Sequence, residues 1–338
     1  MRIRLSLLAP VLLAAPLAAQ SGSHPALFSD TWLAPEPGVG VDEVSIRTRL
    51  VEIDLDLLRD TYARTGNTGV IELNLFDDLS LTAEFDRLES AYGGGLIWHG
   101  RISGDPESEV IFSLVDEFSH ASVRWSDRLY RVAPAGNGLH WVHLVNESLF
   151  KGCGVDASHA IHSPAEALGG GVGGRAGSPD IDVMVPYTTE AKNVSGGTSG
   201  MTSKINLAIT ETNSAYSLST VTQQLVLVHI EEMIGYTEPG SFSQILTDLR
   251  GKNDGKMDNV HSLRDTYSAD CVSLICKNNQ YCGIAYLMTN VSHGFESNAF
   301  SVTNYSCATG YYSFGHELGH NMGSAHDPAN AGSAAYNY

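Results

Sequence analysis

The stretch from His316 to Asp327 reads H-E-L-G-H-N-M-G-S-A-H-D. His316 and His320 are four residues apart, so on a helix they lie on one face, a turn apart. Gly323 allows a sharp turn after that helix, because glycine tolerates left-handed backbone angles. The turn brings His326 round as a third imidazole. Three protein ligands leave one position of a tetrahedral zinc ion open to water, which is typical of a catalytic zinc site.

Glu317 stands between the first two histidines and points in a different direction from His316. From there it can reach a zinc-bound water, act as general base, and pass the proton to a leaving amine. A surface helix can carry an H-E-x-x-H pattern by chance. The glycine and third histidine at fixed offsets make a chance match much rarer. The stretch therefore predicts a zinc hydrolase.

The motif resembles the signature of the metzincin metallopeptidases. Asp327 directly after the third histidine, and Asn321-Met322-Gly323 inside the motif, are similar to the adamalysin (reprolysin-like) branch. Secreted bacterial members, including the peptidyl-Asp metalloendopeptidases, are closest in style. The resemblance is specific over residues 311–327, looser over about 180–310, and weaker before that. It implies an α/β metzincin-like catalytic domain, with a mostly parallel sheet and an active-site helix, that hydrolyses peptide bonds.

The N-terminus predicts export. Two arginines precede a short apolar run that ends in small residues at Ala19, so we interpret residues 1–19 as a signal peptide. That run is short for a bilayer span of about 20 residues, and we expect a secreted protein without a membrane anchor. The net charge of −18, from 38 acidic and 20 basic residues, argues against nucleic acid and anionic membranes as partners.

A glycine-rich segment divides the chain. Residues 163–179 are predicted to be a flexible linker, with Arg175 inside it, and such linkers are where proteolytic cleavage concentrates. The flanking parts, 24–162 and 180–338, are each long enough for a domain.

The part before the linker alternates apolar and polar residues in short runs, which predicts a β-rich sandwich or barrel. Examples are residues 46–57, 69–76, 96–102, 110–115 and 121–132. His140 and His143 are three residues apart, so on a strand they face opposite sides. We interpret them as ordinary strand residues rather than metal ligands.

The part after the linker alternates strand and helix patterns, which predicts a mostly parallel sheet. Strands are expected at 181–187, 224–233, 271–276, 282–287 and 299–305, and helices at 198–216, 242–249, 260–267 and 311–322. The strand that begins Gly283-Ile284-Ala285 resembles the metzincin edge strand beside which an extended substrate lies. A plain core strand is an equally good interpretation of these residues.

Five cysteines are present, an odd number for an exported protein. Among the three possible pairings of the last four, we favour Cys282 with Cys307 and Cys271 with Cys276. That choice leaves Cys153 free, between two glycines. It resembles the cysteine switch of adamalysin-type proenzymes, in which a pro-domain thiolate occupies the open zinc position. Residues 24–162 would then be an inhibitory pro-domain; the alternative is an incidental cysteine.

The sequence departs from the metzincin pattern after His326. The family has a methionine turn beneath the zinc, whereas residues 328–338 contain no methionine. We expect a C-terminally incomplete catalytic domain, either because the chain is a fragment of a longer reading frame or because it is a truncated, inactive relative.

The sequence as a whole predicts the precursor of a secreted zinc endopeptidase with peptide or protein substrates. Two alternatives stay open. One is a secreted binding module in which the β-rich half acts and the metallopeptidase domain is inactive. The other is a zinc hydrolase of non-peptide substrates, which the predicted edge strand disfavours.

Overall fold

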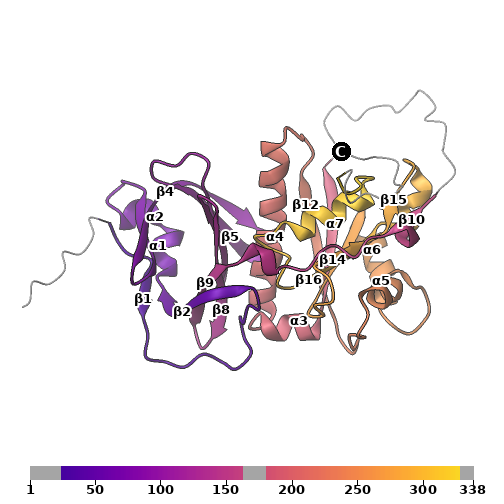
Figure 1. The fold of residues 1–338 in the computed structure, drawn as a ribbon, viewed down its shortest axis with the longest axis horizontal. Helices are drawn as coiled ribbons and strands as arrows, with labels where there is room; N and C mark the ends of the chain where they lie inside the picture. Colours follow the sequence, from indigo (N-terminus) through magenta and orange to yellow (C-terminus); the bar gives the residue numbers. More distant parts are fainter. Residues whose placement is uncertain (1–23, 163–179, 328–338) are drawn as a thin grey trace, which may run out of the picture.

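A computed structural model describes residues 24–162 and 180–327. The predicted signal peptide, the glycine-rich linker and residues 328–338 lie outside this range. Figure 1 shows two domains, a β-rich one formed by the first range and an α/β one formed by the second, with helix α4 between them. Within the described residues, no helix is both long and apolar enough to cross a membrane.

The N-terminal domain is a nine-stranded sheet in the order β1-β2-β9-β8-β7-β6-β5-β4-β3, and its neighbouring strands are antiparallel. The bounds are Phe28–Asp30 (β1), Ser45–Ile53 (β2), Val70–Phe76 (β3), Leu79–Ala91 (β4), Gly95–Ile102 (β5), Glu109–Val115 (β6), Phe118–Trp125 (β7), Arg128–Gly136 (β8) and Leu139–Val145 (β9). The Leu27 N–H donates to the Glu72 carbonyl at 2.9 Å, so the two sheet edges meet. The predicted β-rich domain is confirmed and is barrel-like.

Alternating apolar residues of these strands form the core inside the barrel. Trp98 and Phe112 are fully buried there, and the Trp98 indole donates to the Thr61 hydroxyl at 2.8 Å. Thr61 opens α2 (Thr61–Arg64), which follows α1 (Leu55–Arg59). The barrel therefore has its own apolar core, as an independent domain requires.

Two of the strands predicted for this domain have the wrong bounds. The run 46–57 ends as a strand at Ile53, because the Asp54 side chain accepts from the Leu57 N–H at 3.0 Å and starts α1. The run 121–132 is two strands, because Ser126 adopts a left-handed φ of 57° and turns the chain between β7 and β8.

The C-terminal domain is a five-stranded sheet in the order β12-β11-β13-β16-β14. All pairings are parallel except that of the edge strand β14 with β16. The strands are Ile181–Thr188 (β11), Leu225–Met233 (β12), Cys271–Cys276 (β13), Gly283–Ala285 (β14) and Phe300–Asn304 (β16). The helices are Thr189–Val194 (α3), Thr198–Leu218 (α4), Phe242–Arg250 (α5), Asn259–Tyr267 (α6) and Ser313–Asn321 (α7). The predicted α/β, mostly parallel fold is confirmed.

Helix α4 is buried on both sides. Met201 and Ile205 belong to the core of the α/β domain. On the opposite side, the Ser203 hydroxyl donates to the Ser113 carbonyl of β6 at 2.8 Å and accepts from the His120 N–H of β7 at 3.0 Å. Polar side chains on this helix are therefore explained by its contact with the barrel.

The disulfide prediction is half confirmed. Cys282 and Cys307 form a disulfide, whereas Cys271 and Cys276 are free and buried. The second predicted pair is wrong because both cysteines lie on the single strand β13. Five residues along a strand separate Cα atoms by about 16 Å, far beyond the roughly 7 Å that a disulfide can bridge.

Candidate metal centre and its cleft

Helix α7 and the turn after it bring the three motif histidines together. The rings of His316 and His320 have centroids 4.6 Å apart, and the His326 ring lies 5.3 Å and 4.8 Å from them. Gly323 has φ of 96°, a conformation that other residues adopt only with strain. The sequence-predicted helix and glycine turn therefore place the imidazoles as expected.

Two of the donor pairs have nearly the spacing that a tetrahedral zinc ion needs. His316 Nε2 lies 3.1 Å from His320 Nε2, and Cys153 Sγ lies 3.5 Å from His320 Nε2. Zinc bonded to nitrogen at 2.0–2.1 Å and to sulfur at 2.3 Å would hold such donors about 3.3–3.6 Å apart. The possible ligand atoms of Cys153 and the three histidines all lie within 4.8 Å of one another. His326 Nε2 is buried and has no hydrogen-bond partner in the described residues, which also fits a metal ligand.

His316 and His320 are in the neutral state that cation binding requires. His320 Nδ1 lies 2.7 Å from the Ser324 carbonyl, so Nδ1 carries the proton and Nε2 is free to act as a ligand. Burial lowers the pKa of both His316 and His320 to about 4. Both imidazoles are therefore neutral at pH 7, as metal ligation requires.

Glu317 is fully buried beside these donors. Its Oε2 lies 3.6 Å from Cys153 Sγ, and its Oε1 has no hydrogen-bond partner in the described residues. Burial raises the pKa of this carboxyl to about 8. Gly283 lies against it, and a Cβ at Gly283 would stand only 2.4 Å from Glu317 Oε1. Gly283 therefore makes room for the Glu317 side chain, a reason for this glycine that the sequence did not indicate.

The segment around Cys153 lies along the edge strand of the sheet. The Cys282 N–H donates to the Gly152 carbonyl at 3.0 Å, and the Gly154 N–H donates to the Gly283 carbonyl at 2.8 Å. The resulting bridge between Cys153 and Gly283 is parallel. Further on, β10 (Ala160–Ile161) pairs in parallel with β15 (Leu287–Met288).

The three residues predicted to bind substrate have different surroundings. Gly283 takes part in the pairing with the Cys153 segment. Ile284 and Ala285 are buried and pair with Val302 and Ser301 of β16 on the inner side. The segment from Gly152 to Ile161 therefore covers the edge along which an extended peptide would pair.

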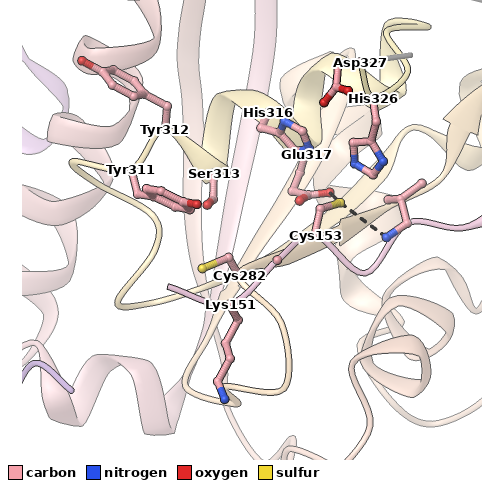
Figure 2. Close-up of a pocket in the computed structure, with 12 residues that line it drawn as sticks. Lys151, Cys153, Cys282, Tyr311, Tyr312, Ser313, His316, Glu317, His326 and Asp327 are labelled. Carbon is pink, nitrogen blue, oxygen red and sulfur yellow. Dashed lines mark hydrogen bonds between the residues drawn. The ribbon is translucent and has the colours of Figure 1, made fainter. Parts of the chain in front are cut away.

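A cleft of about 610 Å³ opens beside the histidines. Figure 2 shows Cys153 next to Glu317, with His316 and His326 nearby and Tyr311 toward the opposite end of the pocket. The Val155 N–H donates to Cys153 Sγ at 3.4 Å, which helps to hold the sulfur in place. The cleft thus combines a four-donor cluster, a buried carboxyl group and a strand edge.

Asn321 connects this site to the sheet, and its position inside the motif gave no sign of that role. Its side-chain amide donates to the Tyr286 carbonyl at 2.8 Å and to the Phe300 carbonyl at 3.1 Å. Tyr286 lies between β14 and β15, where the edge strand leaves β16. Asn321 therefore fixes helix α7 against the edge strand.

The other histidine pair lies away from this cluster. His140 and His143 are buried in β9; His140 Nε2 accepts from the Ser119 N–H at 3.1 Å, and His143 Nε2 lies 3.1 Å from the Gly40 carbonyl. Neither belongs to the group of possible metal ligands. Their interpretation as structural residues agrees with this placement.

Comparisons with known proteins identify relatives of both domains. Residues 202–327 match the Metallo-peptidase family M12B, Reprolysin-like. Peptidyl-Asp metalloendopeptidases from Xanthomonas campestris pv. campestris and Stenotrophomonas maltophilia K279a are 32% and 33% identical, over 77% and 72% of this chain. These alignments cover 64% and 61% of the relatives, so the chain spans less than two thirds of their length.

A match among the solved structures covers a similar share of this chain. Metalloproteinase-II from Bacteroides fragilis matches 76% of this chain and 81% of its own, at 11% identity and a TM-score of 0.43.

Proposed function

We propose that this chain, whose residues 202–327 belong to the reprolysin-like M12B metallopeptidase family, is the exported precursor of a zinc-dependent endopeptidase. The observation that carries the proposal is the convergence of His316, His320 and His326 on one point beside the buried Glu317. The Cys282–Cys307 disulfide and the signal-like N-terminus support export. The peptidyl-Asp metalloendopeptidases among the relatives support endopeptidase activity.

In this proposal His316, His320 and His326 hold zinc, which supplies Lewis-acid polarisation of a peptide carbonyl and acidification of water. Glu317 accepts the proton of the attacking water and delivers it to the departing amide nitrogen. Its pKa of about 8 suits both roles near neutral pH, because a group with a pKa near the working pH both takes and gives protons. Backbone groups at the edge that begins with Gly283 pair with the peptide and hold it extended.

The precursor is proposed to be latent. Cys153 Sγ, 3.5 Å from His320 Nε2, supplies the fourth donor in the position that water needs. The segment Gly152–Ile161 covers the strand edge at the same time. Activation then requires removal of the N-terminal domain, by cleavage within residues 163–179, where Arg175 is a candidate.

The test compares Glu317→Gln with wild type, using the full precursor processed in the linker. Wild type should cleave an unfolded protein and peptides, with an aspartate series included because of the relatives' names, and a chelator should stop it. Glu317→Gln should lose at least about 100-fold in kcat, the lower range for general acid–base catalysis, while it retains zinc by elemental analysis. Glu231→Gln, on the surface strand β12, is the matched control.

Retained cleavage in Glu317→Gln would contradict the mechanism. Absence of chelator-sensitive cleavage in processed wild type would favour the binding-module alternative.

A further inference from the structure

Tyr311 lies in the cleft and stacks on Phe150, which stands just before the segment that covers the strand edge. The rings of Phe150 and Tyr311 have centroids 4.1 Å apart and planes 17° from parallel. Tyr311 lines the same pocket as His316 and Glu317 and is 37% exposed even with this partner in place. It lies two residues before the first residue of α7, so it belongs to the C-terminal domain.

Phe150 reaches Tyr311 as part of an extended peptide. Its φ of −62° and ψ of 143° are extended, and two residues later Gly152 accepts the hydrogen bond from Cys282. Three residues of fully extended chain span about 10 Å, so Phe150 stands at most about that far from Cys153. The stretch from Phe150 to Gly154 therefore shows how a strand-like peptide places a side chain at Tyr311 while its backbone pairs at the edge.

The backbone that carries Tyr311 is held from both domains, and the contact to helix α4 lies within the C-terminal domain. The Gly310 N–H donates to the Glu211 carboxyl group of α4 at 2.7 Å, and Gly310 has φ of 75°. Two N-terminal residues contribute as well: Arg124 of β7 donates to the Gly310 carbonyl, and Arg131 of β8 donates to the Thr309 carbonyl at 3.1 Å. Phe150 also packs against Val44, Leu129 and Val145 of the N-terminal domain. Removal of the barrel takes Phe150 away and uncovers Tyr311 on a backbone that Glu211 still supports.

We propose that Tyr311 forms a subsite of the mature enzyme that binds an aromatic side chain of the peptide substrate, in the place that Phe150 occupies in the precursor. The inference rests on the proposed peptidase function and adds to it a preference at a position several residues from the cleaved bond. Ring stacking adds about 2- to 12-fold in affinity beyond what the buried area of the aromatic side chain contributes. The subsite selects by ring stacking and needs no charge on the substrate.

The first experiment profiles cleavage of a peptide library by the enzyme, produced as the full precursor and then processed. Wild type should favour aromatic residues over alanine at one fixed position by about 2- to 12-fold in kcat/KM. Tyr311→Ala should lose this preference, whereas Tyr311→Phe should keep it. Tyr267→Ala is the matched control. Tyr267 is 40% exposed and stacks on His229 at 3.9 Å, but it lies at the end of α6, outside the cleft.

The second experiment needs no cleavage. A synthetic peptide with the sequence of residues 149–156 and its counterpart with alanine in place of the phenylalanine are titrated onto processed wild type and Tyr311→Ala. The phenylalanine should tighten binding about 2- to 12-fold in wild type and not in Tyr311→Ala.

The outcomes separate the two proposals. A wild-type profile without aromatic preference, or one that Tyr311→Ala leaves unchanged, overturns the subsite. Absence of any cleavage by wild type overturns the peptidase proposal, and the peptide titration then still decides whether Tyr311 binds an aromatic side chain.

Discussion

Cys153 Sγ lies 3.5 Å from His320 Nε2, although 167 residues separate them in the sequence. The sulfur is also 3.6 Å from Glu317 Oε2, so it lies beside both a candidate metal ligand and the candidate general base. Burial and the nearby Glu317 carboxylate raise the pKa of the Cys153 thiol. A thiolate at this point therefore needs a cation among the histidines to stabilise it.

Cys153→Ala should reduce latency. Without the sulfur, the fourth position would be open to water, but the Gly152–Ile161 segment would still cover the strand edge. We expect the unprocessed Cys153→Ala precursor to show at least about 10-fold more peptidase activity than the wild-type precursor, because a bound thiolate is among the strongest zinc ligands. The measurement is cleavage of a short peptide before processing. Cys271→Ala, at the free buried cysteine in β13, is the control, and equal latency in all three proteins would count against the switch.

Gly283→Ala should impair catalysis. The added Cβ would stand 2.4 Å from Glu317 Oε1, so the carboxyl group or the edge strand has to move. Overpacking of this kind costs about 1–3 kcal/mol, and a displaced general base should lower kcat by at least about 10-fold. Kinetics of the processed enzyme check this. Gly240→Ala, where a Cβ meets nothing within 4 Å, should behave as wild type; an unaffected kcat in Gly283→Ala would show that Glu317 is not confined here.

Asn321→Asp should loosen the edge strand. The substitution keeps the shape of the side chain but removes the donor that serves the Tyr286 and Phe300 carbonyls. Leaving buried acceptors unsatisfied costs about 1–3 kcal/mol, so the thermal midpoint should fall. In the proposed function the peptide pairs with that strand, so KM should rise more than kcat falls. Asn298→Asp, on the 3₁₀ turn before β16, is the control. A lower midpoint with unchanged KM would limit Asn321 to a structural role.

Acid should destabilise the N-terminal domain. Burial lowers the pKa of His140 and His143 to about 3, so both are neutral in the folded domain down to that pH. The stability that they contribute is fully present above about pH 6.5, where both histidines are neutral in the unfolded chain as well. It is lost as the pH falls toward 3, because the histidines of the unfolded chain then take up protons. Each can cost up to about 1.4 kcal/mol per pH unit in that window.

Glu211 has the opposite effect on stability, because burial raises its pKa to about 7. The folded protein gains stability from Glu211 as the pH falls below about 7, and this gain ends near pH 4.5, the ordinary pKa of a glutamate. The clearest test is therefore the difference between wild type and His140→Gln in thermal midpoint from pH 7 to pH 4. The variant should lose less stability than wild type over this range. Parallel curves would mean that His140 does not titrate with unfolding.

The site was predictable where its chemistry is local. His316, Glu317 and His320 share one helix, and Gly323 returns His326 within a single turn, so spacing alone places these residues. The strands and the four longer helices of the α/β domain followed from their periodicity, and their bounds agree within two residues, whereas the short helix α3 was not predicted. The run 282–287 is two strands rather than one, since its pairing with β16 stops at Tyr286 and it continues as β15, which pairs with the N-terminal segment.

Contacts between distant segments were not predictable in the same way. Sequence gave no reason to place Phe150 on Tyr311, or Asn321 on the Tyr286 carbonyl, because such pairs depend on how two elements pack. The predicted Cys271–Cys276 pairing is wrong for a related reason, because the short apolar segment that the two cysteines bracket is an extended strand, which separates its ends. Cys153 was identified because the odd number of cysteines leaves one free and because its glycine-flanked setting resembles a known switch.

The most direct test of the account is the coordination shell of zinc in the full precursor, measured by X-ray absorption spectroscopy at pH 7. We predict three nitrogen ligands at about 2.0–2.1 Å and one sulfur at about 2.3 Å, with the sulfur replaced by a light atom in Cys153→Ser. A shell of nitrogen and oxygen alone in the wild-type precursor, or zinc that does not bind at all, would contradict the proposal that Cys153 keeps a zinc peptidase latent.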